Sequence, residues 1–213
     1  MRTTNKDSIA REGLIILGIS FLCTVILARF HFMLAVLGTA WFVFCLYFFR
    51  NPKRVVPTEA NVFIAPADGT ILSISEVDEP HFLKKNMMRV CIFMSPFNVH
   101  VNRAPESGEV LQSQHIDGQF LAAYDERASN QNERCAVHLK TQAGDEIVFV
   151  QIAGWFARRI VNYAKQGDTF NRGEIIGLIK FGSRMDIYLP KSVAVKVALK
   201  QKVKAGETII AER

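Results

Sequence analysis

A histidine flanked by amides is the first group in the sequence that could do chemistry. His100 lies in the segment MSPFNVHVNR, residues 94–103. If this segment is a strand, its period of two places Asn98 and Asn102 beside His100 on one face and apolar residues on the other. An imidazole whose tautomer is fixed by neighbouring amides could transfer protons. A solvated strand face explains the same pattern, so the segment alone does not establish a site.

Two further residues could complete a catalytic set. Asp68, in the segment PADG, could orient or charge-stabilise an imidazole, although Asp-Gly is also a common hairpin turn. Ser183 follows Gly182 and could be a nucleophile, although a Gly-Ser pair is also typical of a turn or bulge. No G-x-S-x-G elbow surrounds Ser183, and β-prone residues continue on both sides. A membrane serine hydrolase using Ser183, His100 and Asp68 therefore stays an alternative with little support from its context.

The segments that would position these residues are predominantly β-prone. From Val62 onward, short apolar runs alternate with turn dipeptides of the Asp-Gly, Ser-Gly and Ala-Gly kinds. This spacing predicts a mainly β fold, a compact barrel or sandwich with very little helix. The segment from Phe120 to Arg134 is the one long polar connection, and part of it could be helical. Its length makes it a candidate loop over a site.

Repeated hairpins make the β region similar to the flattened barrels of lipoyl- and biotinyl-carrier domains. The segment QGDTFNRGEII, residues 166–176, is echoed by KVKAGETII, residues 202–210. In each, a turn glycine precedes an acidic residue and apolar residues. The similarity concerns the fold only, because no Met-Lys-Met or Asp-Lys-Ala tip with a swinging lysine is present. A carrier-like or adaptor barrel without catalysis is therefore a second class of function.

The N-terminal quarter of the chain has the composition of a membrane anchor. Two runs, Gly13–Ala28 and Phe32–Phe49, contain no charged residue. As helices they would reach about 24 and 27 Å, slightly short of a roughly 30 Å hydrocarbon core, which favours a short hairpin. A cleaved signal peptide is disfavoured because a second apolar run follows. We expect a membrane-anchoring hairpin in residues 1–54, with a single re-entrant or interfacial element as the alternative, and a β-rich catalytic domain in residues 55–213.

The net charge of +6 is concentrated around this anchor, and residues 55–213 are nearly balanced. The charge therefore does not indicate a nucleic-acid-binding protein. Basic flanks on both sides of the hairpin, including Arg50, Lys53 and Arg54, favour a cytoplasmic face of the cell membrane for the β-rich domain. They are also expected to attract an anionic lipid surface. The four cysteines form no C-x-x-C pair, and the histidines lack close ligand pairs, so no disulfide or metal is expected.

Five short motifs stand in a specific order along the chain: PADG (66–69), SPFNVHVNR (95–103), NER (132–134), QIAG with ARRI (151–160) and FGSRMD (181–186). Each motif is weak alone. Their joint order resembles the phosphatidylserine decarboxylase proenzymes, in their short bacterial and archaeal branch. With the apolar hairpin, the resemblance covers nearly the whole chain.

The resemblance implies that the chain cleaves itself. The Ser183 hydroxyl would attack the Gly182 carbonyl, elimination would break the resulting ester, and loss of ammonia would leave a pyruvoyl group. The products, a β chain of residues 1–182 and an α chain of residues 183–213, would stay together as a heterodimer. The pyruvoyl group would form a Schiff base with phosphatidylserine and replace pyridoxal phosphate as the electron sink for decarboxylation to phosphatidylethanolamine.

The resemblance also assigns roles to Asp68 and His100, as helpers in base catalysis of self-cleavage or in proton transfer during decarboxylation. The longer bacterial branch has a second histidine where this chain has Arg103. Either His100 therefore takes both proton-transfer roles, or another group such as His115 or His138 enters.

Arg103, Arg158 and Asn98 are the candidate substrate-binding residues. A guanidinium can hold the lipid phosphate or the serine carboxylate through two hydrogen bonds. Arg158 and Arg159 could instead be a pair of surface residues. Because adjacent strand positions point in opposite directions, only one of these two side chains is expected to face the site. The expected partner is phosphatidylserine in an anionic membrane, and a higher oligomer stays open.

Overall fold

The computed structural model describes residues 2–155, 159–180 and 182–213. The chain divides into two compact units, Met1–Lys53 and Arg54–Arg213. We call the second the β-rich unit.

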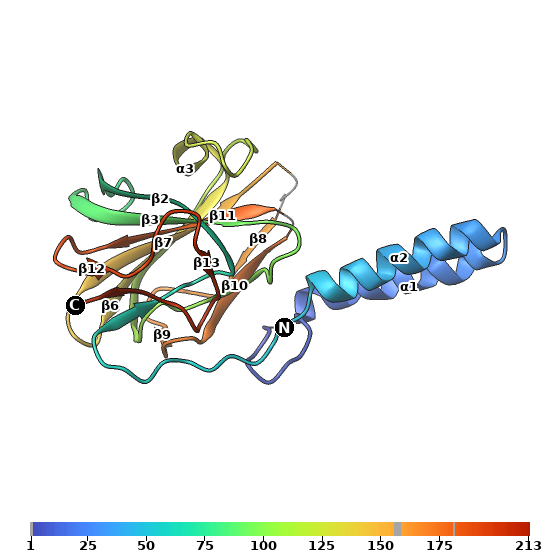
Figure 1. Cartoon of the computed structure of the whole chain (residues 1–213), viewed down its shortest axis with the longest axis horizontal. Coiled ribbons are helices and arrows are strands. Elements are labelled where there is room, and N and C mark those ends of the chain that lie inside the picture. The colour runs from blue at the N-terminus through green and yellow to red at the C-terminus, as the bar shows by residue number, and fades with distance from the viewer. Residues whose placement is uncertain (1, 156–158, 181) are drawn as a thin grey trace. The chain divides into compact units, whose positions relative to one another are not determined.

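Two apolar helices form the first unit. A short 3-10 turn, η1 (Arg11–Gly13), leads into α1 (Leu14–Ala28), and α2 (Phe32–Phe48) returns beside it (Figure 1). Most large apolar side chains of both helices are exposed, so these are not core helices of a soluble domain. The segment Arg11–Ala28 is long and apolar enough to cross a membrane, and α2 is shorter. The predicted helical hairpin is therefore confirmed.

An eight-stranded sheet makes up most of the β-rich unit, and its strand pairs are antiparallel. In spatial order its strands are β13 (Lys202–Val203), β2 (Gly69–Asp78), β3 (Asn86–Met94), β11 (Ser183–Leu189), β7 (Glu146–Ala153), β6 (Arg134–Thr141), β5 (Gly108–Ile116) and β9 (Thr169–Phe170).

Two smaller sheets complete the unit. One contains β1 (Val62–Ile64), β14 (Ile209–Glu212) and β12 (Ala194–Val195), and the other β4 (Val101–Arg103), β10 (Ile175–Lys180) and β8 (Arg159–Asn162). A single turn of helix, α3 (Ala128–Gln131), lies in the predicted loop region between β5 and β6.

Strand β11 lies in the middle of the large sheet and is buried on both faces. Met185, Ile187 and Leu189 pack into the main core on one face, whereas Tyr188 packs with a second cluster on the other. This alternation follows from the period of two in a strand. The first residue of this strand, Ser183, is therefore held by pairing on both sides.

The structure confirms a mainly β chain behind a helical hairpin, but it shows no closed barrel. Across the described residues, the large sheet runs in one order from β13 to β9, and these two end strands do not pair with each other. Each end strand has two residues, and the other short strands pair into separate sheets. The prediction of a barrel or a sandwich is therefore confirmed as a mainly β fold of antiparallel sheets, and the barrel alternative finds no support in the described residues.

Candidate active site

The sheet register gathers the predicted motifs at one end of the large sheet. Ser183 opens β11, opposite Met94 at the end of β3 and Ala153 at the end of β7. The start of β2 pairs with the end of β3, so Asp68, just before β2, lies at the same end. Two strand spacings separate its backbone from that of Ser183, or about 10 Å. Motifs far apart in the sequence thus meet around the Gly182-Ser183 bond.

The Ser183 hydroxyl is buried and donates to the Met94 thioether, with 3.3 Å between Oγ and Sδ. A thioether is a weak acceptor. This contact orients the hydroxyl but does not take its proton, so attack by Oγ needs a base from elsewhere.

A chain of one half-buried and two buried amides ends at the same sulfur. Asn162 donates to Gln151 at 2.8 Å, Gln151 donates to Asn102 at 2.9 Å, and Asn102 donates to Met94 Sδ at 3.6 Å. Each amide is oriented by the next, and the chain thereby holds in place the Met94 side chain that contacts Ser183. Sequence reasoning assigned no role to Gln151 or Asn162, because their contact depends on the packing of β8 against β7.

Gly182 has a positive φ of 46°, in the left-handed region that favours glycine. Its carbonyl oxygen lies against Gly154, where an added Cβ would stand 2.3 Å from that oxygen. Only glycine allows this close approach of the two backbones. Gly154 belongs to the QIAG motif, but its contact with the Gly182 carbonyl could be found only in three dimensions.

An apolar pocket of about 210 Å³ opens beside Gly182. It is lined by Phe93, Pro96, Ala122, Ala123, Tyr124, Trp155 and Gly182. Three of these residues come from the long connection before β6, which Asn132 fastens down by donating to Leu121 O at 2.9 Å and to Ala153 O at 2.7 Å. The connection that the sequence singled out as a possible loop over a site therefore lines this pocket.

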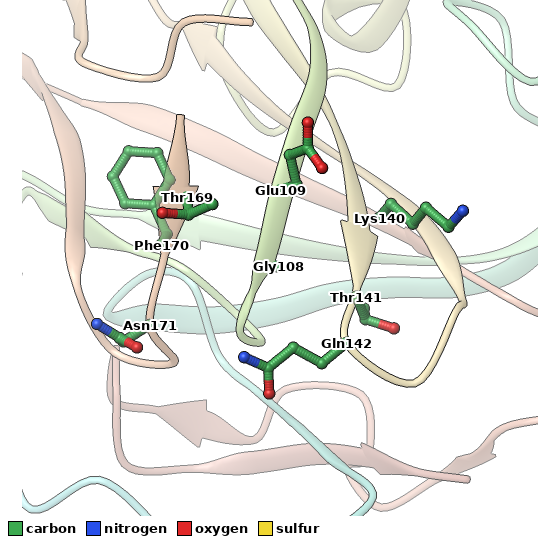
Figure 2. Close-up of a pocket in the computed structure, with 8 residues that line it drawn as sticks. All are labelled: Gly108, Glu109, Lys140, Thr141, Gln142, Thr169, Phe170 and Asn171. Carbon is green, nitrogen blue, oxygen red and sulfur yellow. The ribbon is translucent and has the colours of Figure 1, made fainter. Parts of the chain in front are cut away.

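A larger depression of about 500 Å³ lies elsewhere on the β-rich unit (Figure 2). Its lining includes Glu109 and Lys140, which are direct cross-strand neighbours of opposite charge. Such a pair stabilises a sheet without any ligand. None of the predicted site residues lines this depression, so we place the candidate site at the smaller pocket beside Gly182.

His100 is buried next to the strand that leads to Gly182. Its carbonyl accepts from Ile179 N of β10 at 3.3 Å, and its Nδ1 lies 3.0 Å from Asn98 O. Both His100 and Asn102 are buried, so a solvated strand face is excluded.

The strand predicted around His100 begins only at Val101, and the preceding residues form a turn. In this turn, Asn98 Oδ1 accepts from the backbone N and the Oγ of Ser95, at 2.8 and 2.9 Å. The predicted alternation was therefore wrong for Asn98, because a Ser-Pro-x-Asn sequence closes a turn through its own side chains.

Asp68 and Arg103 belong to one buried cluster. Arg54 Nη2 lies 2.8 and 2.9 Å from the two Asp68 oxygens, and Ala205 N donates to Oδ1 at 2.8 Å. Arg103 Nη1 donates to Gly173 O at 2.9 Å. Burial, together with the charge of Arg54, lowers the pKa of Arg103 to about 10. Arg54 was expected to face the lipid surface, but its side chain is only 6% exposed because it binds Asp68.

The remaining candidates lie apart from Ser183 or outside the described residues. His138 Nε2 lies 2.8 Å from Glu146 Oε2, in the middle of β6. His115 is half exposed and lies 3.5 Å from Asp117 and 3.8 Å from Glu133. Arg158 lies outside the described residues.

The residue after Ser183 carries a buried ion pair on the opposite face of the sheet. Arg184 Nε lies 2.6 Å from Asp186 Oδ1, and Nη2 donates to Cys91 Sγ at 2.8 Å. Burial opposes the charge of Arg184, but Asp186 and Cys91 outweigh it and raise its pKa. Burial also raises the pKa of the Cys91 thiol, to about 12.

This ion pair is also tied to the connection that lines the pocket. Ser129 Oγ of α3 donates to Asp186 Oδ2 at 2.8 Å, and Arg184 Nη1 lies 3.4 Å from Asp125 O. The sequence assigned neither Asp186 nor Ser129 a role. Arg184 and Asp186 are two positions apart in an apolar strand and therefore share a face, which is the one sequence signal that could have predicted the ion pair.

These features define a mainly β protein with an apolar helical hairpin and a buried Gly-Ser bond beside an apolar pocket. A family model described as phosphatidylserine decarboxylase matches residues 41–211. The phosphatidylserine decarboxylase proenzyme of Geotalea uraniireducens is 44% identical over 211 residues, which cover 99% of this chain and 98% of the relative. That of Geobacter sulfurreducens is 45% identical over 216 residues with the same coverage, and that of Ralstonia nicotianae is 44% identical over 209 residues, covering 96% and 95%. The chain belongs to the phosphatidylserine decarboxylase family.

Proposed function

We propose that the chain is a proenzyme that cleaves itself between Gly182 and Ser183 and then decarboxylates phosphatidylserine to phosphatidylethanolamine. The observation that carries this proposal is the environment of one bond. A serine hydroxyl and a left-handed glycine stand at the end of a central strand, beside an apolar pocket. Family membership over nearly the full chain supports the substrate.

In the first reaction, Ser183 Oγ attacks the Gly182 carbonyl carbon. The peptide C–N bond breaks and the nitrogen takes a proton, which leaves an ester. Removal of the proton on the Ser183 α carbon then breaks the Cβ–Oγ bond and releases Gly182 as a carboxylate. The resulting dehydroalanine becomes an imine, and water replaces its nitrogen as ammonia. The product is a pyruvoyl group on the amide nitrogen of Arg184.

His100 is the proposed proton carrier of this site. The 3.0 Å distance between its Nδ1 and Asn98 O fits an N–H at Nδ1. In that tautomer the basic lone pair is on Nε2. Asp68, held by Arg54 and Ala205 N, supplies a fixed carboxylate at the same sheet end.

The surroundings of Ser183 fit a small uncharged keto group, because its nearest partners are the Met94 thioether and the apolar strand ends. When present, the pyruvoyl carbonyl supplies an electron sink for the amino acid head group. The pocket beside Gly182 gives the reacting bond an apolar surrounding, and His100 is the proposed group that returns a proton to the α carbon after carbon dioxide leaves.

The two chains are expected to stay together after cleavage. Strand β11 belongs to the α chain and pairs with β3 and β7 along its length, and β14 pairs with β1. We also propose that residues 1–54 anchor the enzyme in the cell membrane, with the β-rich unit on the cytoplasmic side.

The test of the proposed function is the intact mass of the purified wild-type protein. We expect two chains, residues 1–182 and residues 183–213, the second with a carbonyl-reactive blocked end. A single chain of 24.0 kDa would contradict the proposal. Labelling of that single chain by a phosphonylating reagent would indicate a serine hydrolase, and no labelling would indicate an adaptor.

Gly154→Ala is expected to slow self-cleavage by on the order of 100-fold. The added methyl would stand 2.3 Å from the Gly182 carbonyl oxygen, so one of the two backbones must shift. A displacement of about 1 Å at a reacting group can cost this much in rate. The measurement is the time course of chain cleavage after synthesis, followed by intact mass.

Gly18→Ala is the matched control, because a Cβ built at Gly18 has no atom within 4 Å beyond its chain neighbours and the backbone of its own helix. We expect it to be cleaved at the wild-type rate. Normal cleavage of Gly154→Ala would show that the contact with the Gly182 carbonyl does not position the bond.

A further inference from the structure

Exposed aromatic side chains gather around the pocket beside Gly182. Within the described part of the β-rich unit, five large apolar side chains are exposed: Val55, Phe97, Tyr124, Trp155 and Leu199. Tyr124 and Trp155, at 70% and 68% exposure, line the pocket, and Phe97, at 67%, follows the lining residue Pro96. We call these three residues the aromatic rim. Scattered exposed apolar residues are ordinary, but three aromatic residues at one pocket mark a binding surface.

Two cations face each other next to this rim. Arg159, at the start of β8, is the direct cross-strand neighbour of Lys180, at the end of β10. The next pair inward, Ile160 and Ile179, packs against the main core, so the two cations lie on the outer face of the strands. Two cations at neighbouring positions give this face of the strands a local positive charge, which attracts anionic groups.

The size of the pocket indicates where the rest of a lipid substrate must be. Sites that enclose a drug-sized ligand have volumes of about 300–1,000 Å³. The pocket beside Gly182 has about 210 Å³, which is too small to enclose a diacyl lipid. Most of such a lipid would therefore remain in the bilayer while its head group reaches the Gly182-Ser183 bond. The mouth of the pocket must then meet the membrane surface.

We propose that the aromatic rim and the Arg159–Lys180 pair form a docking face that seats the β-rich unit on an anionic phospholipid bilayer. Tyrosine and tryptophan prefer the level of the lipid head groups, because their rings are apolar with one polar edge. The two cations would bind phosphate or carboxylate groups of the same surface. The argument from pocket size rests on the proposed function, whereas the exposed aromatic rim and the paired cations do not.

The test uses the fluorescence of Trp155 in the full chain. The sequence has two tryptophans, so Trp41→Phe leaves Trp155 as the only one. The chain also carries Ser183→Ala, so that the lipid is not consumed, and is placed in nanodiscs of phosphatidylserine and phosphatidylcholine with bromine near the head groups. We expect Trp155 to lose most of its fluorescence.

The matched control places the reporter at the far end of β3. Asn86→Trp, combined with Trp41→Phe, Trp155→Phe and Ser183→Ala, puts the indole about 27 Å along the strand from Met94 on the same rigid sheet. We expect this reporter to be quenched little. Equal quenching of the two reporters would overturn the docking face, because it would reflect tethering by the N-terminal helices.

A separate experiment tests the charged part of the docking face. Quenching of Trp155 is expected to fall when Arg159 and Lys180 are both replaced by glutamine, and also in nanodiscs of phosphatidylcholine alone. Unchanged quenching in both cases would overturn the proposal as stated. Since the chain with Ser183→Ala cannot make a pyruvoyl group, none of these results depends on the proposed chemistry. The intact mass of the wild type tests that separately.

Discussion

Replacing Ser183 by alanine is expected to leave one uncleaved polypeptide and to reduce decarboxylation of phosphatidylserine below detection. The substitution removes one buried oxygen atom that donates only to the Met94 thioether among its described contacts. Loss of a single weak hydrogen bond should disturb the fold little. The loss of function would therefore come from the missing nucleophile. Intact mass and formation of phosphatidylethanolamine are the two measurements.

Ser75→Ala provides the matched control, since it removes the same atom from a half-buried serine in β2 of the same sheet. We expect it to be cleaved and active. Ser183→Cys is expected to cleave more slowly, because a thiol can still attack the Gly182 carbonyl. Cleavage of the Ser183→Ala chain at the same bond would exclude Ser183 as the nucleophile.

Local sequence patterns predict the helices and strands of this fold, but they do not predict whether the strands close into a barrel. Two uncharged apolar runs were sufficient to predict α1 and α2, and both echoed segments form a turn followed by a strand, β10 and β14. Whether strands close into a barrel depends on pairing between the first and last strands of a sheet. Strands β13 and β9 are too short for their sequences to show which neighbours they take.

The candidate site shows the same limit at the level of single residues. The motifs named Ser183 and Gly182, and the period of two suggested a polar face around His100. That period could not reveal burial on both faces, because β4 packs inside the unit and the turn at Asn98 satisfies its own polar groups. The contact of Gly154 could not be predicted either, since it joins two backbone segments 28 positions apart in the chain.

Asp186→Asn is expected to destabilise the β-rich unit by about 3–5 kcal/mol, the usual cost of leaving one partner of a buried ion pair uncompensated. Arg184 and Asp186 are 2% and 0% exposed, so water cannot solvate the Arg184 guanidinium once the Asp186 carboxylate is removed. For a unit of this size, such a loss lowers the Tm by roughly 10 °C. The measurement is thermal unfolding of the uncleaved Ser183→Ala chain with and without Asp186→Asn, which avoids separation of the two cleavage products.

Two further variants distinguish the buried charge from the shape of the site. Asp117→Asn removes a fully exposed carboxylate and should leave the Tm unchanged. Replacing Arg184 by methionine, Asp186 by leucine and Ser129 by alanine together should recover most of the lost stability, because a packed apolar cluster needs no buried counter-charge. In the cleavable chain, Asp186→Asn should also slow cleavage, since Arg184 is covalently joined to Ser183 and bound to the segment that lines the pocket. An unchanged Tm for Asp186→Asn would mean that Cys91 and the carbonyl of Asp125 hold Arg184 without its carboxylate partner.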